Sequence, residues 1–291
     1  MVRPSNFSFN PQTAESNAFQ RDPGFGTEEI NRRAREEFEK MLEELEKLDI
    51  DVEVIDEPPG TGTPDAVFPN NVFSTHPDGT ICIYPMEAPA RRRERAITVP
   101  RLKGSRYQKC LDLSGFESKD MFLEGTGSLV LDQEHKIAFA CISSRTSPAL
   151  VDTWCERMSY EAFTFSACDR NGNPIYHTNV MMCLGGEFAV ACLESIVDMD
   201  ERTRFIEKIR QTDRELIEIS FDQMYAFAGN MLEISSRGGI RTLVMSKTAK
   251  RSLVPEQIEK LSAYARIADF DIGTIETCGG GSVRCMIAEL F

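Results

Sequence analysis

Five polar side chains recur along this chain at a nearly constant interval. Asn71, Glu124, His177 and Asn230 follow one another at steps of 53 residues, and Cys285 comes 55 residues after Asn230. Few side chains match between the repeated segments, but the order of apolar and polar stretches does. A fixed period near fifty residues is typical of propellers and other repeat architectures, in which each unit folds alike. The interval therefore predicts a fold made of similar units.

Each of the first four recurring residues precedes two apolar stretches joined by a turn, the pattern of a β-hairpin. We expect these hairpins at 72–84, 128–142, 180–193 and 231–245. Helical patterns lie between them, at 27–48, 148–160, 200–216 and 255–267, with a less regular one inside 87–113. The clearest helix is the first, in which Thr27 is the expected N-cap and an apolar stripe runs from Ile30 to Leu48.

The two ends of the chain complement each other. After Cys285 a single strand-like stretch remains, and residues 1–10 supply an apolar-containing strand that would complete a fifth unit. Closing a ring in this way also hides the edges of the sheets. We therefore expect a propeller-like α/β ring. In such a ring the five recurring residues would point toward one axial opening.

The charge balance excludes several classes of partner. The chain has 33 basic and 46 acidic residues, and this net charge of −13 repels the phosphates of nucleic acids. No apolar stretch is long enough to cross a bilayer, and the polar N-terminal segment lacks the apolar core of a signal peptide. We expect a cytoplasmic protein that acts on a small molecule, with no nucleic-acid or membrane partner.

The nine cysteines favour free thiols over a metal site or a disulfide framework. Their number is odd, none forms a Cys-x-x-Cys pair, and only three histidines accompany them. Without an export signal they are expected to be reduced. The sequence therefore predicts no metal and no cofactor.

Cys285, His177 and Glu124 would meet at the axial opening. A thiolate is a strong nucleophile, an imidazole exchanges protons with it, and a carboxylate orients the imidazole. Glycines 279–281 would let a substrate approach the sulfur closely. The structural alternatives are a core cysteine, a hydrogen-bonded core histidine and an exposed carboxylate in a turn.

Other residues of the same types are weaker candidates. Cys278 lies seven residues before Cys285 and is the competing nucleophile, but it is off the period. His76 and His135 lie in polar turns, where we expect both to be solvated. His177 is thus the favoured base.

Four motifs resemble a known superfamily. They are TPDAVFPNN before Val72, LEGTGS around Glu124, YHTN around His177 and the terminal GGGSVRCM. Together they resemble the guanidine-modifying amidinotransferases, arginine deiminases and dimethylarginine dimethylaminohydrolases, over nearly the whole chain, and most closely the citrulline-hydrolysing, amidinotransferase-like branch. The resemblance implies one pentein domain over residues 1–291, a five-bladed α/β propeller. It also implies that Cys285 is the nucleophile, His177 the acid and base, and Glu124 its partner.

The expected head-group contacts depart from those of arginine-acting relatives. Such relatives carry carboxylates where this chain has Asn71 and, in the arginine deiminases, Asn179. Carboxylates suit a guanidinium, whereas amides offer the donors and acceptors that suit a neutral ureido group. Asp65 remains available to bind an amine or guanidinium nitrogen, and the asparagines have the alternative of only bracing the backbone. Phe68 and Asn230 are further candidates for substrate contact.

Two arginine regions are candidates for holding the substrate carboxylate, because the planar guanidinium binds carboxylates with two hydrogen bonds. One is the cluster Arg91, Arg92 and Arg93, for which a solvated surface run is an equal alternative. The other contains Arg145, which we favour. Both regions resemble carboxylate-binding positions of dimethylarginine dimethylaminohydrolases.

The predicted reaction is hydrolysis of a C–N bond at the ureido or guanidino carbon of a small amino acid, with citrulline as the first substrate and ornithine, ammonia and carbon dioxide as products. Within the family, the alternatives are hydrolysis of arginine or a methylated arginine and transfer of an amidino group. A second class is a non-catalytic binding protein of the same fold, similar to the ribosome anti-association factor. The sequence leaves a homodimer open.

Overall fold

Four segments of the chain repeat one arrangement of a β-hairpin, a helix and a third strand. The computed structural model describes residues 1–102 and 106–291. In each unit two antiparallel strands form the hairpin, and the third strand pairs in parallel with the second. The strands are β3 (Phe73–Thr75), β4 (Thr80–Ile83) and β5 (Lys109–Asp112); β6 (Val130–Asp132), β7 (Ile137–Cys141) and β8 (Glu161–Phe165); β9 (Met182–Leu184), β10 (Phe188–Ala191) and β11 (Glu215–Glu218); β12 (Leu232–Ser235), β13 (Arg241–Ser246) and β14 (Arg266–Phe270). All four expected hairpins are confirmed.

Helices connect the second strand of each unit to the third. A parallel pair needs a crossover connection, which a helix provides. The crossover helices are α3 (Pro89–Arg92) with α4 (Arg95–Leu102), α6 (Pro148–Met158), α8 (Met199–Arg210), and α10 (Lys247–Ser252) with α11 (Pro255–Tyr264). The expected helices at 148–160, 200–216 and 255–267 are thus confirmed with shorter C-terminal ends. The predicted helical region 87–113 contains two helices and a strand, and its residues 103–105 lie outside the described residues.

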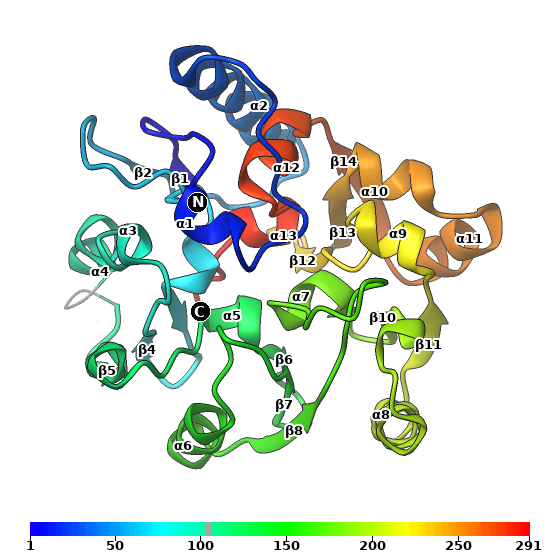
Figure 1. Cartoon of the computed structure of the whole chain (residues 1–291). Coiled ribbons are helices and arrows are strands. Elements are labelled where there is room, and N and C mark those ends of the chain that lie inside the picture. Colours follow the sequence, from blue (N-terminus) through cyan, green and yellow to red (C-terminus); the bar gives the residue numbers. More distant parts are fainter. Residues whose placement is uncertain (103–105) are drawn as a thin grey trace.

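The units lie around a common centre, with the crossover helices on the outside (Figure 1). The middle strands β4, β7 and β10 are buried along their whole length, which explains their continuous apolar sequences. Short helical elements occupy the centre: η1 (Pro69–Asn71), α5 (Gly125–Ser128), α7 (Thr178–Met181) and α13 (Val283–Met286). The remaining elements are η2 (Ser114–Lys119), η3 (Leu193–Ser195), α9 (Phe221–Tyr225) and α12 (Gly273–Gly279).

The fifth sheet has two strands. β1 (Val2–Arg3) pairs in parallel with β2 (Ile55–Asp56), and α1 (Pro11–Ala14) and α2 (Thr27–Lys47) lie between them in sequence. The strand expected after Cys285 is wrong, because Cys285 lies in α13 and residues 287–291 form no strand. The mixed α/β fold is confirmed, but a propeller of five blades is not, since this unit lacks its hairpin.

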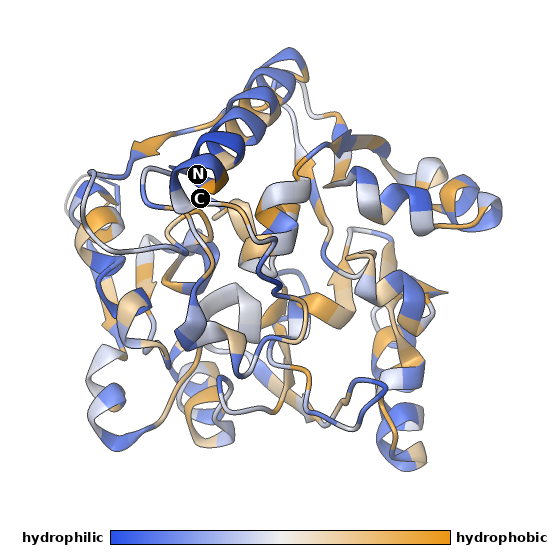
Figure 2. Ribbon diagram, turned by 45° about the horizontal axis from the view of Figure 1, so that its top comes forward, coloured by the Kyte–Doolittle hydropathy of each residue, from blue (hydrophilic) through white to orange (hydrophobic). Residues whose placement is uncertain are grey.

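Helix α2 buries the predicted stripe of apolar side chains, and the rest of its surface is hydrophilic (Figure 2). The acidic residues Glu28 and Glu29 lie in its first turn, where their negative charges interact favourably with the positive end of the helix dipole. Thr27 was expected as the N-cap, but it is the first helical residue, and Gly26 precedes it without a side-chain cap. The residue at which a helix begins depends on the backbone angles there, and the hydrophobic period does not specify them.

His76 is buried, so its expected solvation is wrong. Its Nε2 lies 2.9 Å from Ser74 Oγ and its ring packs against Trp154 at 5.7 Å between centroids. Burial lowers the pKa of His76 from 6.5 to about 4. His135 is exposed, as expected, beside Asp132.

We expect the folded state to lose stability when the pH falls from about 7.5 to about 5. The pKa of His76 is depressed in the folded protein, so its contribution is present above pH 6.5 and is lost as the unfolded chain gains a proton first. The loss from this side chain is about 2 kcal/mol. Urea unfolding of the natural protein and of His76→Gln at both pH values measures it: the variant should lose less stability, and equal losses would contradict the assignment.

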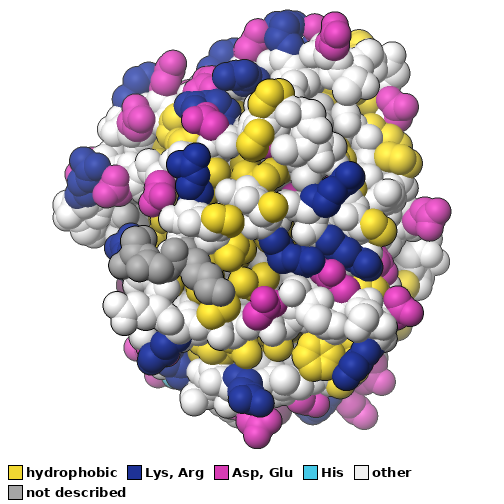
Figure 3. Space-filling view, turned by 90° about the vertical axis from the view of Figure 1, so that its left-hand side faces the viewer, with side chains coloured by type: hydrophobic (Ala, Val, Ile, Leu, Met, Phe, Trp, Pro, Cys, Tyr) yellow, Lys and Arg dark blue, Asp and Glu magenta, His cyan; other side chains and the backbone are white. Residues whose placement is uncertain are grey.

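Charges of both signs are mixed on the face shown in Figure 3, where basic side chains lie among acidic ones. Among the described residues, no helix is long and apolar enough to cross a membrane. All nine cysteines are free thiols.

Candidate active site

The structure brings the five recurring residues to the centre of the molecule. Glu124 and His177 are the N-cap residues of α5 and α7, and Asn71 ends η1. The Asn71 Nδ2 donates to the backbone oxygen of Glu124 at 3.5 Å, and the Asn230 Nδ2 donates to Cys285 Sγ at 3.3 Å. Residues 53 or more apart in sequence are therefore brought into direct contact.

Glu124 is held as a buried carboxylate against His177. Its Oε2 lies 2.8 Å from His177 Nε2, and its Oε1 accepts the backbone N–H of Glu87 at 3.0 Å. Burial alone would raise the pKa of Glu124, but the charge of Arg145 at 3.6 Å, the hydrogen bond from His177 and the charge of Arg91 at 3.9 Å lower it to about 2. Glu124 is ionised at neutral pH.

His177 is a neutral imidazole at neutral pH. Burial lowers its pKa to about 4, although Glu124 acts in the opposite direction. Since Nε2 donates its proton to Glu124, Nδ1 is the nitrogen that accepts a proton. Gly127 allows this arrangement: a Cβ there would lie 2.7 Å from His177 Nδ1 and 2.4 Å from Asn71 Nδ2.

Two amide groups point at the sulfur of Cys285. Asn230 Nδ2 lies 3.3 Å and Asn179 Nδ2 3.6 Å from Sγ. N–H donors aimed at a sulfur stabilise negative charge on it. Cys278 has no such environment: it is buried in the apolar cluster around α12, and burial raises the pKa of its thiol to about 11. Of the two cysteines, Cys285 is thus the one that has amide N–H groups directed at its sulfur.

A small cavity joins these groups. His177 and Cys285 line it, together with five of the predicted substrate-binding residues: Asp65, Phe68, Asn71, Arg91 and Arg145. Asn179 and Asn230 contact the sulfur but do not line this cavity.

The arginine cluster is divided among three environments. Arg91 is buried and donates to Asn71 Oδ1 at 2.7 Å, to the Phe68 oxygen and to both carboxylate oxygens of Glu94. Arg92 lies outside the cavity, where it donates to the backbone oxygen of Met86. Arg93 is exposed. A solvated run therefore describes Arg93 but not Arg91.

Arg145 is buried, and the N-terminal segment covers it. Its guanidinium donates to the backbone oxygen of Thr13 at 2.9 Å and to Ser16 Oγ at 2.6 Å, and it lies over the ring of Tyr176. Asn17 Nδ2 donates to the backbone oxygens of Gly279 and Gly280. The segment 10–17, most of which no sequence-based prediction covered, thus forms one wall of the cavity. Its run of short polar side chains was the signal available in the sequence.

Asp65 has the unpaired acceptor of this cavity. Its Oδ2 accepts from Asn10 Nδ2 at 2.6 Å, whereas its buried Oδ1 has no hydrogen-bond partner among the described residues. Burial raises the pKa of Asp65 against the opposing charge of Arg91. A buried acceptor without a partner is costly, so a bound group with an N–H would satisfy it.

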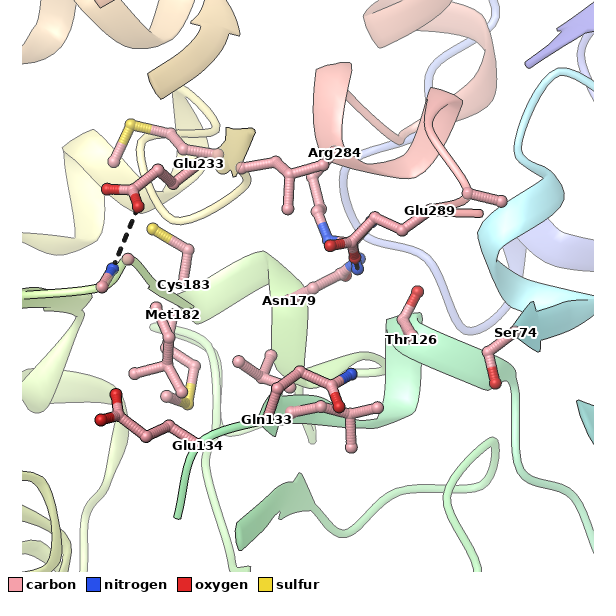
Figure 4. A pocket seen from close by; sticks show the side chains of 18 of the residues that line it. Ser74, Thr126, Gln133, Glu134, Asn179, Met182, Cys183, Glu233, Arg284 and Glu289 are labelled. Carbon is pink, nitrogen blue, oxygen red and sulfur yellow. Dashed lines mark hydrogen bonds and ion pairs between the residues drawn. The ribbon is translucent and has the colours of Figure 1, made fainter. Parts of the chain in front are cut away.

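A larger cavity adjoins the site (Figure 4). Its labelled polar residues come from several units: Ser74, Thr126, Gln133, Glu134, Asn179, Glu233, Arg284 and Glu289. Arg284 pairs with Glu289 at 3.2 Å, and neither His177 nor Cys285 lines the cavity. Chemistry, rather than size, identifies the smaller cavity as the candidate active site. The described residues contain no group of three or more metal-binding side chains.

A family profile described as "N,N dimethylarginine dimethylhydrolase, eukaryotic" matches residues 3–291. No curated protein sequence matches the chain. Among solved structures, the substrate-bound N-terminal domain of ArgZ, an arginine dihydrolase from the ornithine-ammonia cycle in cyanobacteria, has a TM-score of 0.76 at 17% identity, covering 98% of this chain and 95% of that one.

Two further solved structures share the fold. Unliganded AgrE has a TM-score of 0.78 at 19% identity, and the match covers 98% of this chain but 38% of AgrE. A dimethylarginine dimethylaminohydrolase in an adduct with 4-chloro-2-hydroxymethylpyridine has a TM-score of 0.64 at 17% identity, covering 88% of this chain and 90% of that one. The predicted superfamily is confirmed, and these similarities support its pentein fold.

Proposed function

The chain belongs to the N,N-dimethylarginine dimethylhydrolase family, and on that premise we propose that it hydrolyses a C–N bond at the ureido or guanidino carbon of a small amino acid, with citrulline as the first substrate. The observation that supports this most is one cavity containing the Cys285 thiol, the neutral His177 and the unpaired oxygen of Asp65. We include in the proposal a single domain of five units, the fifth of them reduced to β1 and β2.

The thiol of Cys285 gives its proton to His177 Nδ1, and its sulfur attacks the ureido carbon. Glu124 holds the imidazolium that forms. The C–N bond to ornithine then breaks, and the leaving nitrogen takes the proton from His177. The product on the enzyme is a carbamoyl thioester. Water, activated by the same imidazole, releases carbamic acid, which decomposes to ammonia and carbon dioxide, and the thiol is restored.

Asn71 and Asn179 favour the neutral head group. Arg91 donates to Asn71 Oδ1, and Asn71 Nδ2 donates one N–H to the backbone oxygen of Glu124, so its second N–H is the group left to face a substrate. Asn179 also directs its Nδ2 toward the sulfur. N–H donors beside the nucleophile suit the oxygen of a ureido group, and Asp65 Oδ1 accepts one of its N–H groups. A guanidinium has no acceptor to offer either amide.

The second candidate is hydrolysis of arginine or a methylated arginine. The buried Asp65 supports it, because a carboxylate near the nucleophile attracts a guanidinium. Related folds include AgrE with L-arginine bound and a dimethylarginine dimethylaminohydrolase. Arg91 and Arg145 lie in the same cavity and oppose a third positive group.

Side-by-side assays of citrulline, arginine and asymmetric dimethylarginine distinguish these candidates. Release of ornithine from citrulline supports the first, and release of citrulline from arginine or dimethylarginine supports the second. If the purified protein turns over none of them, the proposed enzyme class is wrong.

We expect Asn71→Asp to shift the preference toward guanidino substrates. The change places a negative charge where Arg91 now binds an amide oxygen, and a carboxylate attracts a cationic head group more than a neutral one. The ratio of kcat/KM for arginine to kcat/KM for citrulline should rise about tenfold, which corresponds to about 1.4 kcal/mol. Asn70→Asp, one residue earlier and bonded to Thr126, is the control. An unchanged ratio in Asn71→Asp would exclude this role.

A further inference from the structure

Glu276 is a buried carboxylate that the proposed reaction does not use. It lies on α12 with 4% of its surface exposed, and its neighbours include the apolar side chains of Ile275, Cys278 and Val283. No lysine or arginine within the described ranges forms an ion pair with it. Burial raises the pKa of its carboxyl. Burying a carboxyl group in this way costs folding free energy unless the group is hydrogen-bonded.

A hydroxyl group binds the carboxyl group of Glu276 directly. Ser282 Oγ donates to Oε1 at 2.7 Å, and the nearby hydroxyl groups of Ser246 and Thr248 act to lower the pKa of the carboxyl group. Ser246 is the N-cap of α10 and accepts the backbone N–H of Ala249 at 3.0 Å. The carboxyl group is therefore bound to the segment after α12 and lies near the start of α10.

That segment leads directly to the nucleophile. Ser282 is the N-cap of α13, and its backbone oxygen accepts the N–H of Cys285 at 2.9 Å. The backbone oxygen of Glu276 accepts the N–H of Gly280 at 2.9 Å. Glu276 thus binds the segment 279–282 at Gly280 and at Ser282, and the three glycines of this segment line the cavity. Figure 1 shows α12 and α13 side by side near the centre.

A glycine segment does not hold its own conformation, because glycine has more backbone freedom than any other residue. Asn17 and Tyr176 bind the segment on the cavity side, through the backbone oxygens of Gly279 and Gly280. Ser282 is bound on the other side by Glu276 alone among the described side chains. Among the side-chain bonds to the segment 279–282, this one is the closest in sequence to Cys285.

We propose that Glu276 is a positioning residue for the nucleophile: through Ser282 it sets the place of α13, and so of Cys285 Sγ relative to His177. The proposal rests on the proposed function only in taking Cys285 as the nucleophile. A displacement of about 1 Å between reacting groups costs about 10²-fold in rate.

Glu276→Met and Glu276→Gln test this role. Methionine has a similar length but accepts no strong hydrogen bond, so kcat should fall about 10²-fold, while KM changes little because the cavity residues remain. Glutamine keeps an oxygen for Ser282 and should restore most of kcat. Ser282→Ala removes the same bond from the other side and should reproduce the effect of Glu276→Met. It also replaces that variant if methionine prevents folding.

Glu37→Met is the matched control. Glu37 is also a partly buried carboxylate that holds α12, since it accepts the N–H groups of Thr274 and Ile275, but it does not touch the glycine segment. This control should lower the melting temperature and leave kcat unchanged. An equal loss of kcat in Glu37→Met, or wild-type kcat in both Glu276→Met and Ser282→Ala, would overturn the proposal.

Alkylation of Cys285 by iodoacetamide, followed by peptide mass spectrometry over a range of pH, gives a measurement that needs no substrate. We expect slower alkylation at each pH in Glu276→Met, with recovery in Glu276→Gln. This result holds even if no tested amino acid is turned over, so failure of the proposed function and failure of the positioning role are distinguishable. Unchanged alkylation in both Glu276→Met and Ser282→Ala would also count against the role.

Discussion

Replacing the proposed nucleophile, in Cys285→Ser, is expected to abolish turnover while the protein stays folded. A serine hydroxyl is far less ionised than a thiol, and the neutral His177 is too weak a base to compensate. The loss in kcat should be at least about 10⁴-fold. The side chains are similar in size, so Asn230 and Asn179 can keep their hydrogen bonds. Steady-state kinetics and the circular dichroism spectrum check both parts.

Cys278→Ser provides the control for this substitution. Cys278 is fully buried in the apolar cluster of α12, so a hydroxyl there lacks the partners it needs. We expect the free energy of unfolding to fall by about 1–3 kcal/mol and kcat to remain near that of the natural protein. Activity retained in Cys285→Ser and lost in Cys278→Ser would reverse the assignment of the nucleophile.

Glu124→Gln should also lower kcat by about 10⁴-fold, because the amide permits the wrong tautomer of His177 and does not stabilise its charged form. In the natural protein the carboxylate is ionised and 2.8 Å from Nε2. Binding of the substrate should be less affected, because Glu124 does not line the cavity. A pre-steady-state measurement of thioester formation would locate the loss in the step of nucleophilic attack.

The same change removes a negative charge that lies near Arg91 and Arg145. Breaking a buried set of charges in this way costs about 3–5 kcal/mol of folding free energy. Glu94→Gln is the matched variant, since it removes a carboxylate that binds Arg91 without touching His177. We expect both variants to be less stable and only Glu124→Gln to lose the chemical step. Equal kinetic losses would mean that the charge set, rather than the histidine contact, supports catalysis.

Local patterns were sufficient to predict the repeated units. The four hairpins and the helices that begin at Pro148, Met199 and Pro255 lie within a few residues of their expected positions. Alternation of apolar residues and the turn signals between them act over a few residues, so they can be recognised without the fold. The strand expected after Cys285 failed because glycines 279–281 lead into a helical turn, α13.

Burial is the property that local patterns predicted least well. His76 lies in a polar turn yet is buried against Trp154, a residue on α6 that is 78 positions later in the chain. Arg91 and Arg93 differ by two positions, but one is buried among carboxylates and the other is exposed. Each outcome depends on which distant element packs against the residue.

The sequence by itself determined which residues occupy equivalent positions: Cys285, His177 and Glu124 share one period with two asparagines, because a repeated fold places equivalent positions around the same centre. Only the tertiary structure decided which atoms these residues present. Arg91 binds the amide oxygen of Asn71, the segment 10–17 covers Arg145, and one oxygen of Asp65 has no hydrogen-bond partner among the described residues. These contacts depend on how segments far apart in the chain pack against one another and bury each other's side chains. The spacing of a repeat does not specify this packing.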